Sequence, residues 1–228
     1  FVIPTGAGSF KDAMQIGCEV FHNLKAVIKE KYGGDATLIG DEGGFAPPCD
    51  VQQGVDLLME GIKRSGYENE MTLGLDVAAS EFKVDGQNAY DLDFKTTGAD
   101  KDAAALLTGD EMVEFYQKLI RDYPFVTVED PFDQDDWANW SKFCKSVGTD
   151  CQVVGDDLTV TNPTKIEQAV KEYIIRLPTD LSHPLVANLP KRWRLVGRVG
   201  QFGALAKQMA CSRSAGWLRG IYGVSAFE

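Results

Sequence analysis

The chain has 228 residues, of which 25% are charged and 44% hydrophobic, and its formal net charge is −11 at pH 7. The acidic balance excludes the basic surface that sequence-independent nucleic-acid binding needs, and no apolar run approaches the ~18 residues of a membrane-spanning helix. The five cysteines form no Cys-x-x-Cys pair, so we expect free thiols in a reducing, cytoplasmic setting.

The N-terminal part of the chain predicts two amphipathic helices. Residues 9–31 carry apolar side chains at helical spacing after a capping serine, and Gly33-Gly34 ends the run. Residues 51–65 predict a second helix, closed by Gly66. A loop with three glycines and two prolines, residues 40–48, lies between them.

Three short apolar stretches further along the chain each predict a buried strand that ends in a carboxylate. They are residues 73–76 with Asp76, 125–129 with Glu129, and 152–156 with Asp156.

Helical segments are predicted between and after these strands. Thr108 is placed to cap a helix that runs to Arg121, with Glu111 in the capping-box position. Further helices are expected near residues 135–147 and after Asn162-Pro163. Residues 90–94 alternate like a short hairpin strand beside the Asp85-Gly86 turn. Strands that alternate with helices indicate an α/β fold with a parallel sheet, closed or open.

The carboxyl ends of parallel strands meet at one edge of a sheet, so Asp76, Glu129 and Asp156 are expected to converge. Taken singly, each acid is more often a turn or capping residue. Three together repel one another unless a hard cation holds them, and Mg²⁺ is the usual choice. A calcium module is disfavoured because the sequence has no Asp-x-Asp-x-Asp-Gly loop.

Glu42 lies in the glycine-rich loop and has two interpretations. One is a flexible surface turn. The other is a carboxyl group that a mobile loop delivers to a ligand as a general acid. The loop is not a phosphate-binding P-loop, because no Gly-Lys-Ser/Thr follows it.

The character of the sequence changes near residue 170. Residues 1–170 carry a net charge of −17, whereas residues 171–228 carry +6 and three closely spaced prolines. We therefore divide the chain into an α/β part, 1–170, and a basic, proline-containing tail, 171–228. The tail is interpreted either as a flexible appendage or as a segment foreign to the preceding fold, for instance the product of a shifted reading frame.

Long motifs in the first part resemble enolase, in that family's order. They are residues 21–25, 40–47, 76–82, 90–95, 128–137 and 155–163. The resemblance covers roughly residues 1–170 and implies an enolase-type (β/α)8 TIM-like barrel domain. That barrel is expected to be incomplete, with the family's N-terminal domain and the last strands missing or altered.

The resemblance also implies a function, phosphopyruvate hydratase, which is a hydro-lyase. Such enzymes interconvert 2-phospho-D-glycerate and phosphoenolpyruvate in glycolysis and gluconeogenesis, require Mg²⁺, and are usually cytoplasmic homodimers. Matched motif to motif, Asp76, Glu129 and Asp156 stand at the metal ligands. Glu42, Glu129 and Asp156 stand at substrate-binding positions, and Glu42 also matches a catalytic glutamate.

The tail departs from the family pattern. An enolase should have a base lysine in a Lys-Val-Asn-Gln-like strand after residue 170, and residues 172–200 contain no such motif. The Ser-His-Arg-Ser phosphate loop is absent from the sequence as well. The alternative function is therefore a catalytically inactive, enolase-like Mg²⁺-binding fragment or binding protein.

Overall fold

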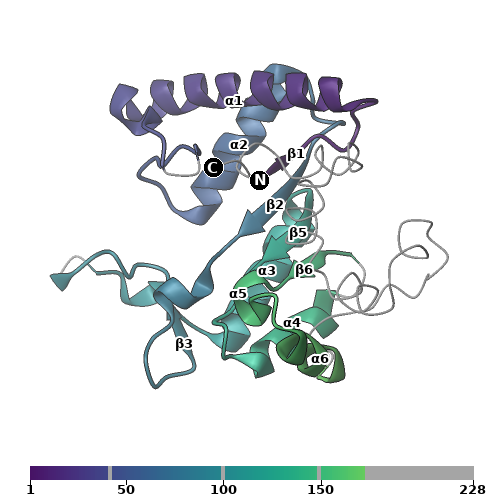
Figure 1. Cartoon of the computed structure of the whole chain (residues 1–228). Helices are drawn as coiled ribbons and strands as arrows, with labels where there is room; N and C mark the ends of the chain where they lie inside the picture. The colour runs from purple at the N-terminus through teal and green to yellow at the C-terminus, as the bar shows by residue number, and fades with distance from the viewer. Residues whose placement is uncertain (41–42, 99–100, 148–149, 173–228) are drawn as a thin grey trace. The chain divides into compact units, whose positions relative to one another are not determined.

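The computed structural model describes residues 1–40, 43–98, 101–147 and 150–172 (Figure 1). Over this part the chain forms two compact units, Phe1–Thr72 and residues 73–172. The strands are β1 Val2–Ile3, β2 Thr72–Asp76, β3 Ala89–Asp91, β4 Leu106–Thr108, β5 Phe125–Glu129 and β6 Gln152–Val154. The α-helices are α1 Phe10–Tyr32, α2 Val51–Ser65, α3 Gly109–Asp122, α4 Trp137–Val147, α5 Asp156–Thr159 and α6 Pro163–Lys171. Short 3-10 helices are η1 Gly34–Thr37, η2 Ala79–Phe82 and η4 Ala103–Ala105.

Both predicted helices of the first unit are confirmed, and their ends have local causes. At the start of α1, Ser9 Oγ accepts a hydrogen bond from Asp12 N at 3.2 Å. Helix α2 begins with a capping box of Asp50 and Gln53. It ends at Gly66, whose φ of 76° is the left-handed conformation that glycine adopts without strain.

Helices α1 and α2 pack closely against each other. Val20 and Ile28 of α1 and Ile62 of α2 are almost fully buried. The close approach depends on Gly61, because a Cβ there would lie 3.1 Å from Leu24 Cα. A helix pair of this kind gains its stability from the buried apolar faces rather than from helix propensity.

The second unit is built on three parallel strands in the order β2, β5, β6. In register, Asp76 of β2 lies opposite Glu129 of β5, and Glu129 lies opposite Val154 of β6. Helix α3 precedes β5 and helix α4 joins β5 to β6 (Figure 1). This strand–helix alternation confirms the predicted α/β class. Within the described ranges the strands form an open sheet and do not close a barrel.

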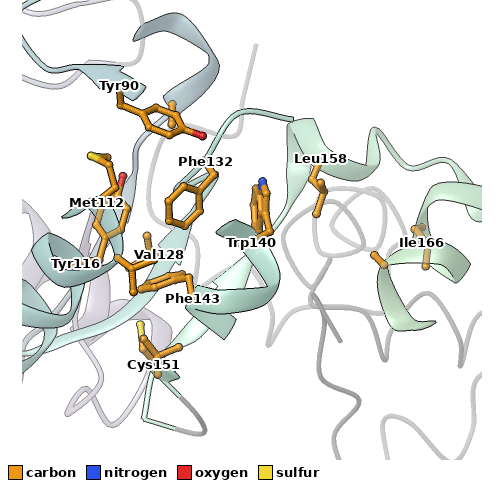
Figure 2. Packing of buried hydrophobic residues seen from close by; sticks show 14 residues of the cluster. Tyr90, Met112, Tyr116, Val128, Phe132, Trp140, Phe143, Cys151, Leu158 and Ile166 are labelled. Carbon is orange, nitrogen blue, oxygen red and sulfur yellow. The ribbon is translucent and has the colours of Figure 1, made fainter. Parts of the chain in front are cut away.

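The core of this unit is a cluster of buried hydrophobic side chains that includes several packed aromatic rings and is called the aromatic core below (Figure 2). Phe132 lies at its centre and packs edge-on against the rings of Tyr90, Tyr116, Trp140 and Phe143. Leu75 of β2 and Val128 of β5 also belong to this core. Successive side chains of a strand point to opposite faces, so the next residues, Asp76 and Glu129, are directed away from the core.

One pairing in the second unit was not predicted. The expected hairpin contact at the Asp85-Gly86 turn is present as a bridge between Lys83 and Tyr90. Strand β3, however, forms its ladder with β4, in which Tyr90 lies opposite Leu107. The predicted strand at residues 90–94 is correspondingly shorter, since β3 ends at Asp91. Beyond residue 172 the predicted tail lies outside the described residues.

Candidate metal centre

Asp76 and Glu129 meet at the carboxyl ends of β2 and β5, as the sequence predicted. Together with Asp130 they form a group in which one oxygen of each carboxylate lies within 4.8 Å of the others. Asp76 is exposed, Glu129 is half-buried and Asp130 is buried. Oxygen donors at this spacing are the ligand set that hard divalent cations prefer.

Backbone hydrogen bonds fix these strand ends relative to one another. Val77 N donates to Glu129 O at 3.0 Å, so the pairing of β2 with β5 extends past Asp76. Ala78 and Asp130 then turn the chain, with φ values of 47° and 43°. Both values are left-handed, and aspartate is among the few non-glycine residues enriched in that region.

The segment after Glu129 is anchored in the aromatic core. Tyr116 Oη donates to Pro131 O at 2.9 Å, and Trp140 Nε1 donates to Asp133 O at 3.0 Å. Burial raises the pKa of the Tyr116 phenol, which therefore stays a neutral donor. The core thus holds the chain that carries Glu129 and Asp130 in one position.

Asp130 is the most unusual group of the cluster electrostatically. Burial raises the pKa of its carboxyl to about 7, and the negative charges of Asp157, Asp76 and Asp156 add to this effect. A hydrogen bond from Asp157 N to Oδ2, at 3.2 Å, acts in the opposite direction. Oδ1 is buried and has no hydrogen-bond partner among the described residues.

These observations fit a bound cation. A buried carboxylate oxygen without a partner is costly, and several carboxylates facing one another repel. The positive charge of a divalent cation among these oxygens would offset the repulsion and would also stabilise the unpartnered Asp130 oxygen electrostatically. The residues present therefore match an oxygen-ligated site for a hard metal ion such as Mg²⁺.

Asp156 is placed differently from the other two predicted ligands. It is the first residue of α5, directly after β6 and Gly155. It adds to the negative potential at Asp130, but it is not a member of the group whose oxygens lie within 4.8 Å. Gly155 lets α5 pack closely, because a Cβ there would lie 3.0 Å from Leu158 Cδ2. The role of Asp156 as a ligand stays a prediction.

Two further acidic residues, Glu42 and Asp130, compare differently with the sequence predictions. Glu42 lies outside the described residues, so its catalytic and substrate-binding roles also stay predictions. Asp130 is not among the ligands predicted from the sequence, although its carboxylate belongs to the group in the structure. The available signal was its position: a second acid directly after the strand-terminal Glu129, before a proline.

Residues 1–177 match the sequence profile of the family described as "Enolase, C-terminal TIM barrel domain". The chain belongs to this family. Enolase-type membership and the α/β barrel class predicted from the sequence are thereby confirmed, and the open sheet is part of a barrel fold. No helix in the described part of the chain is long and apolar enough to cross a membrane.

Proposed function

We propose that this enolase-family chain carries the Mg²⁺-dependent chemistry of phosphopyruvate hydratase, the reversible dehydration of 2-phospho-D-glycerate to phosphoenolpyruvate. One observation carries the proposal. In a chain that belongs to this family, Asp76, Glu129 and Asp130 converge at the carboxyl ends of neighbouring parallel strands. In barrel enzymes this edge of the sheet bears the active site.

Asp76, Glu129 and Asp156 would hold the cation in this proposal. A cation at this position supplies positive charge to a substrate carboxylate, whose negative charge grows when the neighbouring carbon loses a proton. Glu129 and Asp156 would also orient the substrate. Glu42 would transfer a proton to the leaving C3 hydroxyl, as a general acid does.

A second candidate function rests on the tail. Enolase-superfamily sites use a lysine or histidine base. Residues 172–200 contain no Lys-Val-Asn-Gln-like motif, and neither Lys171 nor Lys191 fits that role by its sequence context. This observation favours a catalytically inactive protein that still binds Mg²⁺ through the carboxylates.

Metal binding and turnover separate the two candidates. We expect Mg²⁺ to bind the wild-type chain in titration calorimetry, and the double variant Asp76→Asn/Glu129→Gln to bind at least about 100-fold more weakly, because even indirect ligand contacts cost 10–100-fold. Glu114→Gln is the matched control, since it removes one exposed carboxylate on α3. Its Mg²⁺ affinity should equal that of the wild type.

Turnover is measured in the same samples by the ultraviolet absorbance of phosphoenolpyruvate. Mg²⁺ binding with turnover supports the hydratase. Binding without turnover supports the inactive Mg²⁺-binding protein. A wild-type chain that binds Mg²⁺ no better than the double variant contradicts both candidates.

The proposal includes the remaining expectations from the resemblance. Sedimentation analysis of the same samples tests whether the chain forms a homodimer. The described cysteines Cys18, Cys49, Cys144 and Cys151 are free thiols, which supports a reducing, cytoplasmic setting.

A further inference from the structure

Asp130 contacts three different segments of the second unit. Its backbone N donates to Val154 O, at the end of β6, over 2.9 Å. Its backbone O accepts from Ala79 N, at the start of η2, at 3.2 Å. Its side-chain Oδ2 accepts from Asp157 N, in the first turn of α5, at 3.2 Å. One residue therefore connects the chain that follows β2, β5 and β6.

Only one of these contacts depends on the aspartate side chain. The two backbone contacts are open to any residue that accepts a φ of 43°. The contact from Oδ2 to Asp157 N needs a side-chain oxygen at this position. The side chain of Asp130 thus acts specifically on the start of α5, where Asp156 precedes Asp157.

The start of α5 needs such an oxygen from elsewhere in the fold. The first N–H groups of a helix have no intrahelical partner and are normally capped by the side chain before the helix. The N-cap position of α5 is Gly155, which provides no side-chain cap. A residue with a side chain is disfavoured at this position, because its Cβ would lie only 3.0 Å from Leu158 Cδ2.

We propose that Asp130 is a positioning residue, whose Oδ2 caps α5 from the neighbouring strand and so fixes Asp156 relative to Asp76 and Glu129. The inference rests on the proposed function for the claim that these acids bind Mg²⁺. Asp130 acts through Asp156 and does not itself need to touch the cation.

The cap is tested first without metal. Hydrogen exchange of the peptide segment 152–161 is compared between wild type, Asp130→Ala and Asp130→Asn. Asp130→Ala removes the acceptor and should speed exchange of the Asp157 amide, whereas Asp130→Asn keeps an oxygen and should leave it close to the wild-type rate. Unchanged exchange in Asp130→Ala contradicts the cap.

Magnesium affinity then tests the positioning role. We expect Asp130→Ala to weaken Mg²⁺ binding about 10–100-fold, the range for residues that orient a metal ligand. Asp130→Asn should bind more tightly than Asp130→Ala. Asp157→Asn is the matched control, because it also removes one nearby charge but keeps the backbone N–H that donates a hydrogen bond to Asp130 Oδ2. The two asparagine variants should therefore show the same modest loss.

Asp130→Asn with an affinity as low as that of Asp130→Ala would overturn the inference, because the charge or a direct metal contact would then be what matters. Should Asp130→Ala not fold, Asp130→Gly replaces it, since the φ of 43° suits glycine. A wild-type chain that binds no Mg²⁺ refutes the proposed function and the positioning of a metal site with it. The metal-free exchange still decides separately whether Asp130 caps α5.

Discussion

Replacing Gly109 by alanine should destabilise the protein, although glycine-to-alanine changes in helices usually stabilise. Gly109 is the first residue of α3 and is buried. A Cβ at this position would lie 1.9 Å from Asn139 Nδ2 and 2.4 Å from Asn139 Cγ. Asn139 must therefore move, and it is itself only 5% exposed.

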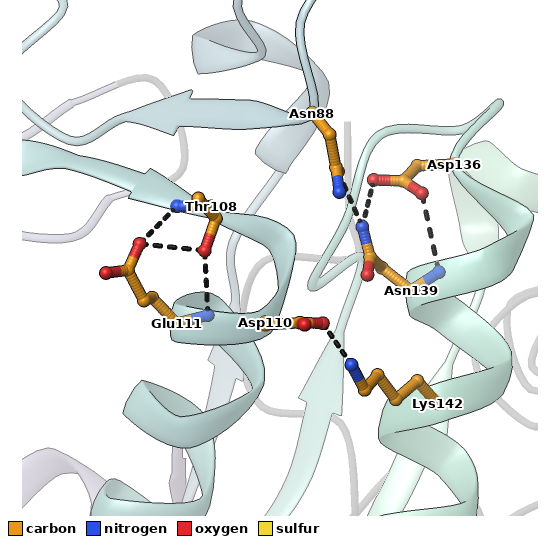
Figure 3. Close-up of polar contacts among 7 residues, drawn as sticks. All are labelled: Asn88, Thr108, Asp110, Glu111, Asp136, Asn139 and Lys142. Atoms are coloured by element: carbon orange, nitrogen blue, oxygen red, sulfur yellow. Dashed lines mark hydrogen bonds and ion pairs between the residues drawn. The ribbon is translucent and has the colours of Figure 1, made fainter.

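The cost follows from the hydrogen bonds that Asn139 would lose (Figure 3). Its Nδ2 donates to Asn88 Oδ1 at 2.9 Å and to the Asp136 carboxylate at 2.7 Å. A neutral hydrogen bond contributes about 1 kcal/mol and one to a charged group about 1.5–3 kcal/mol. The alanine gains about 0.4–1 kcal/mol from the unfolded chain. We expect a net loss of about 2 kcal/mol in the free energy of unfolding.

Chemical denaturation of a double-mutant cycle measures this effect. Gly109→Ala is compared in the wild-type background and in Asn139→Ala, where the clashing side chain is absent. In the second background the substitution should be neutral or stabilising by up to about 1 kcal/mol. An equal loss in both backgrounds would refute the argument, because the destabilisation would then not come from Asn139.

Four further predictions concern the core, the cap of α3, the pH dependence of stability and the cysteines. Phe132→Ala should lower the free energy of unfolding, measured by chemical denaturation, by about 3–5 kcal/mol, because the side chain is 1% exposed and packs against four rings. A loss smaller than that caused by Thr108→Ala would contradict the central place of Phe132 in the core. Thr108→Ala should lower the free energy of unfolding by about 1 kcal/mol through loss of the α3 cap. Thr164→Ala is the control, because the cap of α6 is Asn162. Hydrogen bonds from Thr108 N and Oγ1 lower the pKa of Glu111 below its usual 4.5. The Glu111 carboxylate therefore stabilises the folded protein above pH 4.5, and this stabilisation is lost as the pH falls through the lowered pKa. Glu111→Gln should therefore show a flatter loss of stability on acidification than the wild type. Burial raises the pKa of the Cys151 thiol to about 12, and we expect iodoacetamide to label exposed Cys18 in the native protein but Cys151 only after unfolding, as peptide mass spectrometry would show.

Helix ends were predicted well because their causes are local. Ser9 and the pair Thr108 and Glu111 satisfy N–H groups within one turn, so a short sequence window contains the whole explanation. The same holds for Asn162, whose Oδ1 accepts from Thr164 N at the start of α6. Strand β4 was missed because its pairing with β3 joins residues such as Tyr90 and Leu107, whose contact no local pattern encodes.

The candidate site was predicted only as far as strand ends can be identified. Asp76 and Glu129 follow legible apolar runs, and the structure brings their carboxylates together. Asp130 was missed because its environment depends on distant residues. Its left-handed φ of 43° and its contact with Asp157, which lies in another element, are not visible in the sequence. Its pKa, raised chiefly by burial, likewise reflects the packed fold rather than its neighbours in the chain.

The core and the acidic cluster are two consequences of the same strand register. Leu75 and Val128 face the aromatic core, so the residues that follow them must face the other side of the sheet. A slip of one residue would bury Asp76 and Glu129 among rings, so core packing specifies where the acids lie. The acids in turn repel one another, and Asp130 adds a buried oxygen without a partner among the described residues. The folded chain without a cation therefore retains an electrostatic cost that packing offsets. A cation that binds only the folded state removes this cost and should raise stability by about 2.7 kcal/mol at 100 times its dissociation constant.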